Sequence, residues 1–447
     1  MRFHVIVGIC LLGSLGLLAQ TPGSLDTNFV PATAYTDVLW TLAVQSDGKI
    51  LVGGRRGSTL GVIYRLNTNG SVDPAFSSGA RATCLDSTIP IINALSLQTN
   101  GNVVLGGAFT YFDTVSLRSR LAQLNPSGLL DLTFSPSAGN SVLATAIQPD
   151  GKIIIGGNFT NFKGSGKNNL ARMNPDGSLD STFNTQGTGP QARVGAVALG
   201  PDGTILIGGD FTAVNGIARL YVARLLSDGT VDTNFDLSFS GPDGTVSAIA
   251  VQPDRKVIIG GAFLNVAGAG RGAIARLNDN GTLDPTFAPS SGCDSYVWAL
   301  AVQSNGRILA GGRFNNVNGQ ARSKIARFNP DGTLDSTFDP AAGAGAGSSD
   351  EIRAIQLQPD GRIVVAGKFT TFSNNARNGM AQLLGDPVAP RLGLQLASTN
   401  IVLNWTGSFT LQSAANPAGP YLDVTNAGTP PCTHPIHAGT EFFRLRN

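Results

Sequence analysis

The sequence predicts an all-β protein, and three observations support this fold class. Only 13% of the 447 residues are charged, 57 are glycine, and the apolar residues fall in short runs rather than at helical spacing. Asp-Gly and Asn-Gly pairs, which favour tight hairpins, separate many of these runs. The chain also repeats itself with a period of about 50 residues, which is typical of radial or stacked arrays of β units.

One unit of sequence occurs seven times. In the third copy it begins with Gln148-Pro-Asp-Gly-Lys, passes through Ala171-Arg-Met-Asn-Pro-Asp-Gly and ends with Leu179-Asp-Ser-Thr-Phe. Each such unit needs its neighbours to bury its apolar faces. The first segment of the seven copies is anchored at Gln45, Gln98, Gln148, Gly200, Gln252, Gln303 and Gln358.

Each copy is expected to contain four strands, named a to d in chain order. In the third copy these are residues 142–148, 152–157, 170–174 and 179–183. Strands a and b are almost continuously apolar, as expected for strands that are buried on both faces. Asp-Gly or Asn-Gly pairs between a and b, and again between c and d, predict two tight hairpins. The short turns therefore lie at one end of the strands, the turn end, and the longer b–c and d–a loops lie at the other, the loop end.

The N-terminus is expected to complete the seventh unit. The c segment at residues 380–383 has no Leu-Asp-x-x-Phe after it, whereas an isolated copy of that motif stands at Leu25-Asp-Thr-Asn-Phe. Because c and d are hairpin partners, the N-terminal segment would supply the missing strand and remove the open edges. We therefore expect a seven-bladed β-propeller over residues 20–386, with an open β-solenoid as the alternative. The sequence leaves open whether blades are divided between d and a or between b and c.

The repeated unit also resembles a known family. The pattern Gln-Pro-Asp-Gly-Lys-Ile, Gly-Gly-x-Phe, Ala-Arg-Leu-Asn-x-Asp-Gly and Leu-Asp-x-x-Phe is similar to the delta-sixty repeat of bacterial β-propellers, over about residues 25–385. The resemblance implies an exported propeller in a family of mostly unknown function. It assigns no catalytic or ligand-binding residue.

The two ends of the chain are expected to differ from the propeller. Residues 1–19 have the basic start, apolar run and small final residue of a signal peptide, so we expect an exported protein: extracellular, on the cell surface or periplasmic. No later stretch approaches the ~20 apolar residues of a membrane span. Residues 387–447 break the period, and their short apolar runs predict a small β-sandwich-like module. Cys84, Cys293 and Cys432 allow at most one disulfide within a monomer, and we expect isolated buried thiols.

Side chains that enzymes use are scarce. The expected propeller contains no His and a single Glu, Glu351, so we expect no enzyme and no cofactor. One alternative stays open, in which loop-end aspartates such as Asp37 and Asp294 act as acid and base of a carbohydrate-active hydrolase or lyase. The spacing of His434 and His437 is compatible with zinc, and oxygen-bearing side chains surround Gly177 as in some calcium loops. Turn chemistry explains the latter equally well, and we expect no metal site.

An arginine in strand c and an aspartate in strand d recur together. We expect them to form an ion pair across the c–d hairpin. Where Gln123 replaces the arginine, we expect its amide to bond Asp131, and we expect Gln382 to face Asp26. The five pairs are Arg65 with Asp73, Arg172 with Asp180, Arg224 with Asp232, Arg276 with Asp284, and Arg327 with Asp335. In the fifth copy Arg255 stands where other a–b turns have glycine, and a positive φ there would cost about 1 kcal/mol or more.

A basic residue also precedes strand c in six of the seven copies. It stands where the long b–c loop enters the strand, so we expect a broken ring of positive charge on the loop-bearing face, suited to an acidic polysaccharide or a protein carboxylate cluster. The alternative is that each residue braces its own loop. The candidate ligand-binding residues, called the loop ring below, are Arg118, Lys167, Arg219, Arg271, Arg322 and Arg377.

These observations predict an exported, non-catalytic binding or adhesion propeller. It would present its loop face, as a monomer, to an anionic glycan or other polymer or to a protein partner, and we expect no nucleic-acid partner. The hydrolase or lyase is the alternative from another class. Trp40, Trp298 and Tyr296 lie near strand a and are either sugar-stacking residues or part of the core.

Overall fold

The computed structural model describes most of the chain from residue 21 onward. Contacts divide it into a unit of residues 21–384 and a C-terminal part from residue 385, and each is described by itself. The expected signal peptide lies outside the described residues. These are 21–33, 37–76, 81–84, 89–112, 116–185, 187–235, 241–345, 347–386, 392–397, 400–405, 410–415, 420, 422–424, 432–435 and 442–446.

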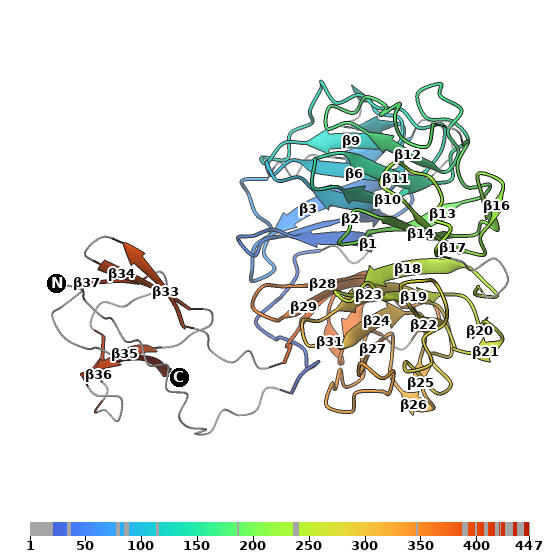
Figure 1. Ribbon diagram of the computed structural model, residues 1–447. Coiled ribbons are helices and arrows are strands. Elements are labelled where there is room, and N and C mark those ends of the chain that lie inside the picture. Colours follow the sequence, from blue (N-terminus) through green and yellow to red (C-terminus); the bar gives the residue numbers. More distant parts are fainter. Residues whose placement is uncertain are drawn as a thin grey trace, which may run out of the picture. The chain divides into compact units, whose positions relative to one another are not determined.

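Strands a, b and c occupy equivalent positions in seven sheets (Figure 1). Strand a is β1 (Asp37–Val44), β5 (Ile91–Leu97), β10 (Val142–Ile147), β13 (Val194–Leu199), β18 (Val246–Val251), β23 (Val297–Val302) and β28 (Glu351–Leu357). Strand b is β2 (Ile50–Arg56), β6 (Val103–Ala108), β11 (Ile153–Gly157), β14 (Ile205–Gly209), β19 (Val257–Gly261), β24 (Ile308–Gly312) and β29 (Ile363–Lys368). Strand c is β3 (Leu60–Leu66), β9 (Leu121–Leu124), β12 (Leu170–Met173), β17 (Val222–Leu225), β22 (Ile274–Leu277), β27 (Ile325–Phe328) and β32 (Met380–Leu383).

The seven sheets form a closed ring. Each has the antiparallel order a–b–c, so the blades are divided between d and a. The a strands are innermost and contact one another around the ring, with β1 touching both β5 and β28. The prediction of a closed seven-bladed β-propeller, rather than an open solenoid, is confirmed.

Apolar residues of strands a and b fill the space between neighbouring blades. Leu51 of β2, Ile92 of β5 and Leu105 of β6 share one buried cluster. The first glycine of each Gly-Gly pair lets the next blade come close: a Cβ added to Gly106 would lie only 2.6 Å from a methyl carbon of Val142 in the next a strand. The repeated glycine is therefore a packing requirement of the ring.

The N-terminal segment closes the ring as predicted. Leu25 forms an antiparallel bridge with Leu383 of β32, and the Asp26 N–H donates to the Gln382 carbonyl at 2.8 Å. Phe29 is only 1% exposed, in a cluster made by blades 1 and 7. The N-terminus thus supplies segment d of the seventh blade.

Segment d is shorter than the predicted strand. In the third blade only Leu179 bridges strand c, and the other blades likewise show a single bridge. The chain turns at the next residue, because Asp180 Oδ1 accepts the Thr182 N–H at 3.0 Å and the Asp180 carbonyl accepts the Phe183 N–H at 3.3 Å. This turn directs Phe183 into the core, where it is 2% exposed.

The loop end carries additional pairing. Short hairpins lie within the b–c loops: β7 (Tyr111–Phe112) with β8 (Ser116–Leu117), β15 (Ala213–Val214) with β16 (Ile217–Ala218), β20 (Asn265–Val266) with β21 (Ala269–Gly270), β25 (Asn316–Val317) with β26 (Gln320–Ala321), and β30 (Thr371–Phe372) with β31 (Asn375–Ala376). The connection entering a blade bridges the b–c loop of that blade, as Pro190 does with Val214. In blade 2 the connecting strand β4 (Arg81–Thr83) pairs with β7 and with β3. These loops are thus tied to the scaffold.

The C-terminal part contains two three-stranded antiparallel sheets. One is β33 (Leu392–Ala397), β34 (Asn400–Trp405) and β37 (Cys432–Pro435), and the other is β36 (Leu422–Asp423), β35 (Thr410–Ala414) and β38 (Phe442–Arg446). Cys84, Cys293 and Cys432 are free thiols; Cys293 and Cys432 are buried as expected, whereas Cys84 is half-buried. In the part of the chain that the structure describes, no helix is long and apolar enough to cross a membrane.

Candidate functional site

The predicted Arg–Asp pairs are confirmed at the turn end of the blades. In all five, the arginine Nε lies 2.7 to 2.8 Å from the aspartate Oδ2, and both side chains are largely buried. The guanidinium also stacks on the phenylalanine of segment d, 4.6 to 5.1 Å from the ring centre. In the third blade Lys152 adds a second cation, with Nζ 2.9 Å from Asp180.

These arginines also join neighbouring blades. Arg172 Nη1 donates to the Ser227 carbonyl at 2.5 Å and Arg276 Nη1 to the Pro330 carbonyl at 2.6 Å, both in the c–d turn of the next blade. This contact has no signal in the sequence, since any residue type provides the carbonyl. The guanidinium groups are therefore used for assembly of the ring, and we call the repeated arrangement the blade latch.

The two glutamine variants of the latch differ from expectation. Gln123 Nε2 donates to Gln98 Oε1 at 2.9 Å rather than to Asp131, whose carboxylate accepts the Thr133 hydroxyl instead. Gln382 likewise bonds Gln358, and only its backbone carbonyl meets Asp26. An amide is both donor and acceptor, so it pairs with the amide of the anchor glutamine.

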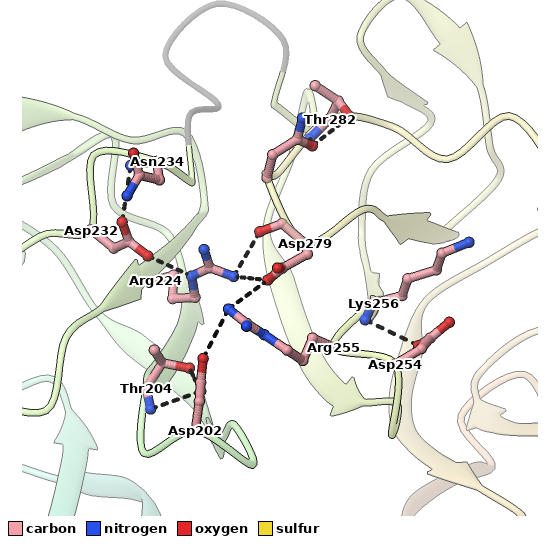
Figure 2. A network of polar contacts seen from close by, with 11 residues as sticks. Asp202, Thr204, Arg224, Asp232, Asn234, Asp254, Arg255, Lys256, Asp279 and Thr282 are labelled. Atoms are coloured by element: carbon pink, nitrogen blue, oxygen red, sulfur yellow. Dashed lines mark hydrogen bonds and ion pairs between the residues drawn. The ribbon is translucent and has the colours of Figure 1, made fainter.

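Blade 4 builds its latch from different residues (Figure 2). Thr204 stands where five of the other six blades have lysine or arginine, and Arg224 Nη1 donates to Asp279 Oδ1 of the next blade at 2.5 Å. Arg255 bonds the same Asp279 at 3.2 Å and reaches back to Asp202 at 3.0 Å. Its φ of 68° confirms the predicted positive value. The substituted turn of blade 5 thus supplies part of the blade 4 latch.

The loop ring is engaged with its own backbone. Arg118 Nη1 donates to the Leu117 carbonyl at 2.7 Å, and its Nη2 reaches the Leu132 carbonyl at 3.3 Å. Arg219, Arg271, Arg322 and Arg377 repeat the first of these bonds, and Lys167 Nζ donates to the Gly187 carbonyl at 2.8 Å. Arg118, Arg219 and Arg377 are less than 10% exposed. These contacts are those of the loop-bracing alternative, and a ligand-binding role for the ring stays a prediction.

Asp37 and Asp294 are each occupied by neighbouring donors. Arg56 Nε lies 2.8 Å from Asp37, and the Tyr64 hydroxyl donates to it at 2.9 Å. Burial, reinforced by the Asp37 charge, raises the pKa of Tyr64. Asp294 accepts the Asn316 amide at 2.7 Å, and such bonds outweigh burial and lower its pKa. In this geometry both carboxylates hold local structure.

A β-bulge recurs in every a strand. In β1 the register shifts between Leu39 and Thr41, and the equivalent shift occurs in the other six. The second glycine of the Gly-Gly pair makes room, because a Cβ on Gly209 would lie 1.9 Å from the Arg193 carbonyl oxygen. A bulge re-aims its extra side chain. The seven bulge residues are Trp40, Asn93, Leu143, Gly195, Ser247, Trp298 and Arg353.

The bulge residues surround the loop end of a central channel. They lie on the innermost strands, and a Cβ added to Gly195 would meet no atom within 4 Å, so this position faces open space. Further along the a strands is a cavity of about 410 Å³ that reaches Leu42, Leu95 and Leu357. A second cavity of about 550 Å³ lies among the turns of blades 2 to 4, beside Leu97 and Ile147. No charged side chain lines either cavity.

Blades 6, 7 and 1 build a continuous stack at the loop end of this channel. Arg353 of blade 7 lies between Trp40 and Trp298, with its guanidinium carbon 4.3 and 4.4 Å from the two ring centres. Tyr296 stacks on the other side of Trp298, at 5.2 Å and an interplanar angle of 9°. Glu351 Oε1 fixes the guanidinium at 2.7 Å. Burial lowers the pKa of Arg353, whereas Glu351 acts to raise it.

Two of the three bulge residues of the stack, Trp40 and Trp298, were candidates from the sequence, but their proximity was not predicted. Trp40, Trp298 and Arg353 each stand five positions before the glutamine that anchors their repeat. Aligning the repeats by that anchor places all three on adjacent blades of a closed ring. Arg353 was not predicted, because it lies in strand a, outside the b–c loops in which the basic residues recur.

The described residues contain no group of three or more His, Cys, Asp or Glu that could hold a metal ion. In the loop around Gly177, Asp176 Oδ1 accepts the Ser178 N–H at 2.8 Å and the Ser178 hydroxyl at 2.7 Å. Turn chemistry therefore accounts for this loop. His437 of the zinc alternative lies outside the described residues.

Comparison with protein-family models identifies one family. The model described as domain of unknown function (DUF5122) beta-propeller matches residues 45–76, 98–134, 148–183, 200–235, 252–287, 303–338 and 358–386, together more than half of the chain. No curated protein matches.

Solved structures share the fold at low identity. The extracellular domain of BT4673 from B. thetaiotaomicron is 14% identical, with a TM-score of 0.52 over 91% of this chain and 48% of that chain. This chain therefore spans about half its length. The WD40 beta propeller domain of Doa1 is 13% identical, with a TM-score of 0.50 over 78% of this chain and 94% of that chain.

Proposed function

The chain belongs to the DUF5122 beta-propeller family, and we propose that it is a non-catalytic binding protein whose ligand contacts the loop end of the central channel. The single observation that carries this proposal is the stack of Tyr296, Trp298, Arg353 and Trp40. Aromatic faces beside an arginine are suited to stacking on a ligand while bonding its polar groups. The proposal keeps the loop face as the binding face, but it assigns the ligand to the channel rather than to the loop ring.

The stack is more than a packing feature of the repeat. The equivalent positions in the other four blades are Asn93, Leu143, Gly195 and Ser247, so the blade fold does not require aromatic residues there. Tyr296 is 41% exposed, so part of its aromatic ring is accessible to a ligand. Binding residues on a rigid scaffold commonly lie where a repeated architecture departs from its pattern.

The carboxylates support binding over catalysis. Glu351 is bonded to Arg353, Asp37 to Arg56, and Asp294 to the Asn316 amide. A general acid needs a carboxyl group whose pKa is raised, whereas hydrogen bonds lower the pKa of Asp294. No acid and base of a hydrolase are therefore proposed from these residues.

An exported location forms part of the proposal. The signal-like residues 1–19 and the resemblance to the delta-sixty repeat both support export. The BT4673 domain that shares the fold is described as extracellular. An exported binding protein or adhesin would meet extracellular polymers or surface proteins.

Intrinsic fluorescence tests the proposed site directly. The chain has three tryptophans, of which Trp40 and Trp298 lie in the stack and Trp405 lies in the C-terminal part. In a Trp405→Phe variant all tryptophan emission comes from the channel. Hits from a glycan array should change this emission, and the same glycans should remain undegraded in a depolymerisation screen. Hits that leave the emission unchanged would place binding elsewhere, and shortened products would make the protein an enzyme.

A further inference from the structure

We propose that the ligand at this site contains an acidic saccharide, whose carboxylate groups pair with Arg55, Arg313 and Lys368, while one of its sugar rings stacks on Tyr296. We call the three cations the mouth triad. This inference rests on the proposed function and specifies its ligand class. The loop ring takes no part in it.

The mouth triad coincides with the aromatic stack around the ring. The residue that follows Gly-Gly, or Ala366-Gly367 in blade 7, at the loop end of strand b is basic only in blades 1, 6 and 7, which are consecutive because the ring is closed. The same three blades carry Trp40, Trp298 and Arg353. In blades 2 to 5 this position is Ala108, Asn158, Asp210 or Ala262. Two independent positions of the repeat thus change together in one arc.

The triad lacks carboxylate partners among the described residues. Arg313 Nε donates to the Ser348 carbonyl at 2.9 Å, and Arg55 Nη1 donates to the Gly57 carbonyl at 2.8 Å. Arg313 and Lys368 are exposed, and Arg55 is half-buried. Bonds to neutral carbonyls leave the charges uncompensated, in contrast to the latch arginines, each of which faces an aspartate.

Two of the nearby acids are already paired with cations. Glu351 is held by Arg353, and Asp210 accepts Arg193 Nε at 2.7 Å and the Thr245 hydroxyl at 2.6 Å. The charge of Arg313 is among the influences that lower the pKa of Arg353, so the triad and the stack interact electrostatically. The arc therefore has a net positive field that favours an anion.

The form of the stack favours a sugar over a planar base. Arg353 already fills the space between Trp40 and Trp298, so a ligand has no slot in which to intercalate. Tyr296 is the exposed end of the stack. A sugar places its C–H face on such a ring and extends its substituents sideways. A carboxylate substituent then reaches arginine or lysine, which bind it through charge-assisted hydrogen bonds.

The test is a fluorescence titration of the Trp405→Phe protein with three probes: trigalacturonate, neutral galactotriose and adenosine monophosphate. Trigalacturonate should change the emission and bind at least about 10-fold more tightly than galactotriose. Its affinity should fall as salt rises from 50 to 500 mM, because salt screens exposed charges beyond a Debye length of about 10 Å at 0.1 M.

Two triple variants with equal charge loss locate the anion site. R55Q/R313Q/K368Q should weaken trigalacturonate binding about 10-fold or more and remove most of its salt dependence. R219Q/R271Q/R322Q removes three loop-ring charges from the same face and should leave affinity within about 2-fold. Circular dichroism and thermal unfolding check that both fold, and the single variant Arg313→Gln replaces the first triple if it does not.

The outcomes separate the inference from the proposed function. Equal binding of trigalacturonate and galactotriose, or an unaltered affinity in the mouth-triad variant, overturns carboxylate recognition but leaves a binding site at the stack. Tighter binding of adenosine monophosphate overturns the saccharide class. Absence of any response to trigalacturonate overturns the inference, whereas array hits that leave the channel emission unchanged overturn the proposed function itself.

Discussion

At the turn end of the blades the same side chains recur around the ring, whereas the loop end of the channel differs from blade to blade. Five blades repeat an arginine, an aspartate and a phenylalanine with nearly identical distances. The bulge position of strand a holds six residue types among seven blades: tryptophan, asparagine, leucine, glycine, serine and arginine. Both ends belong to the same repeated blades, so the shared backbone fold alone does not account for the difference.

The comparison separates residues that hold the blades together from residues that can vary without disturbing the ring. A latch arginine contacts its own blade and the next, so any change disturbs a blade junction. A bulge side chain enters the open channel, where Asn93, Gly195 and Trp298 are all accommodated. A departure from the repeat is therefore expected to lower stability at the turn end, whereas at the loop end it indicates a residue used for function.

The largest expected effect is at the closure of the ring, where the repeat is completed by a distant segment. Phe29→Ala should destabilise the protein by about 3 to 5 kcal/mol, because it opens a cavity where blades 1 and 7 meet. Urea unfolding followed by circular dichroism measures the loss. Deleting residues 20–30 should lower the melting temperature further, since it exposes the edge of the last blade.

Val30→Ala is the matched control for this prediction. Val30 is the next residue in the chain but is 58% exposed, so its truncation should change stability by less than about 0.5 kcal/mol. Equal effects of the two substitutions would mean that the segment is not a buried closure.

The second prediction concerns the blade latch. Arg276→Ala should cost about 3 kcal/mol or more, because it leaves the buried Asp284 without its nearest cation and frees the Pro330 carbonyl. A double-mutant cycle with Asp284→Ala should give a coupling of about 0.5 to 3 kcal/mol. Additive losses would contradict the pairing.

Arg276→Gln tests whether an amide can replace the latch arginine in this blade. The anchor glutamine of this blade, Gln252, has a buried Oε1 with no partner among the described residues. An amide at position 276 would be placed to bond it, as Gln123 bonds Gln98 in blade 2. The glutamine variant should therefore be more stable than the alanine variant in the same urea titration.

The sequence predicted contacts correctly wherever the repeated motif of a single blade determines them. The ring closure followed from the isolated copy of the motif at Leu25 and the c segment that lacked it. The Arg–Asp pairs followed because both residues lie on arms of one hairpin. Strand d was overestimated, because the turn made by Asp180 with the Thr182 N–H depends on a side-chain bond that the apolar pattern does not contain.

Contacts between blades were less predictable. The bond from Arg172 to the Ser227 carbonyl joins residues in separate repeats through a group that every residue has. The stack of Trp40, Arg353 and Trp298 required both the closed ring and the common bulge. The spacing of the loop ring predicted its charge but not the carbonyl groups that engage Arg219 and its equivalents, and its ligand-binding role stays a prediction.

The third prediction is a dependence of stability on acid. The hydrogen bond from Lys49, aided by the Ala75 N–H, lowers the pKa of Asp73 to about 2. A carboxylate whose pKa is lower in the folded state stabilises the protein above its unfolded pKa of about 3.9, and loses this contribution as pH falls towards 2. The melting temperature should therefore be nearly constant from pH 8 to 5 and fall below about pH 4.

Lys49→Gln tests whether the acid dependence of stability arises at the turn end of the blades. It should lower stability at pH 7 and make the decline below pH 4 shallower, because the folded pKa of Asp73 moves back towards its usual range. Lys368→Gln removes a loop-end cation and should leave the acid profile unchanged in shape. If the two variants showed the same dependence of melting temperature on pH, the acid sensitivity would not arise from the latch.

The smallest expected effect is at Arg255, where the turn end itself departs from its pattern. The residue holds a φ of 68° and its exposed side chain bonds Asp202 and Asp279. Arg255→Ala keeps the strained backbone and loses both pairs, so it should cost about 1 kcal/mol, since exposed ion pairs contribute about 0.2 to 1 kcal/mol each. Arg255→Gly loses the same pairs but relieves the strain, which is worth about 1 kcal/mol, so it should stay within about 0.5 kcal/mol of the parent.

Gly306→Ala measures the strain alone, because the equivalent turn of blade 6 has a φ of 82° and leaves 3.5 Å between an added Cβ and Pro330. If unfolding titrations show the glycine variant to be as unstable as the alanine variant at Arg255, the ion pairs of Figure 2 outweigh backbone strain, and this turn belongs with the latch rather than with the tolerated exceptions.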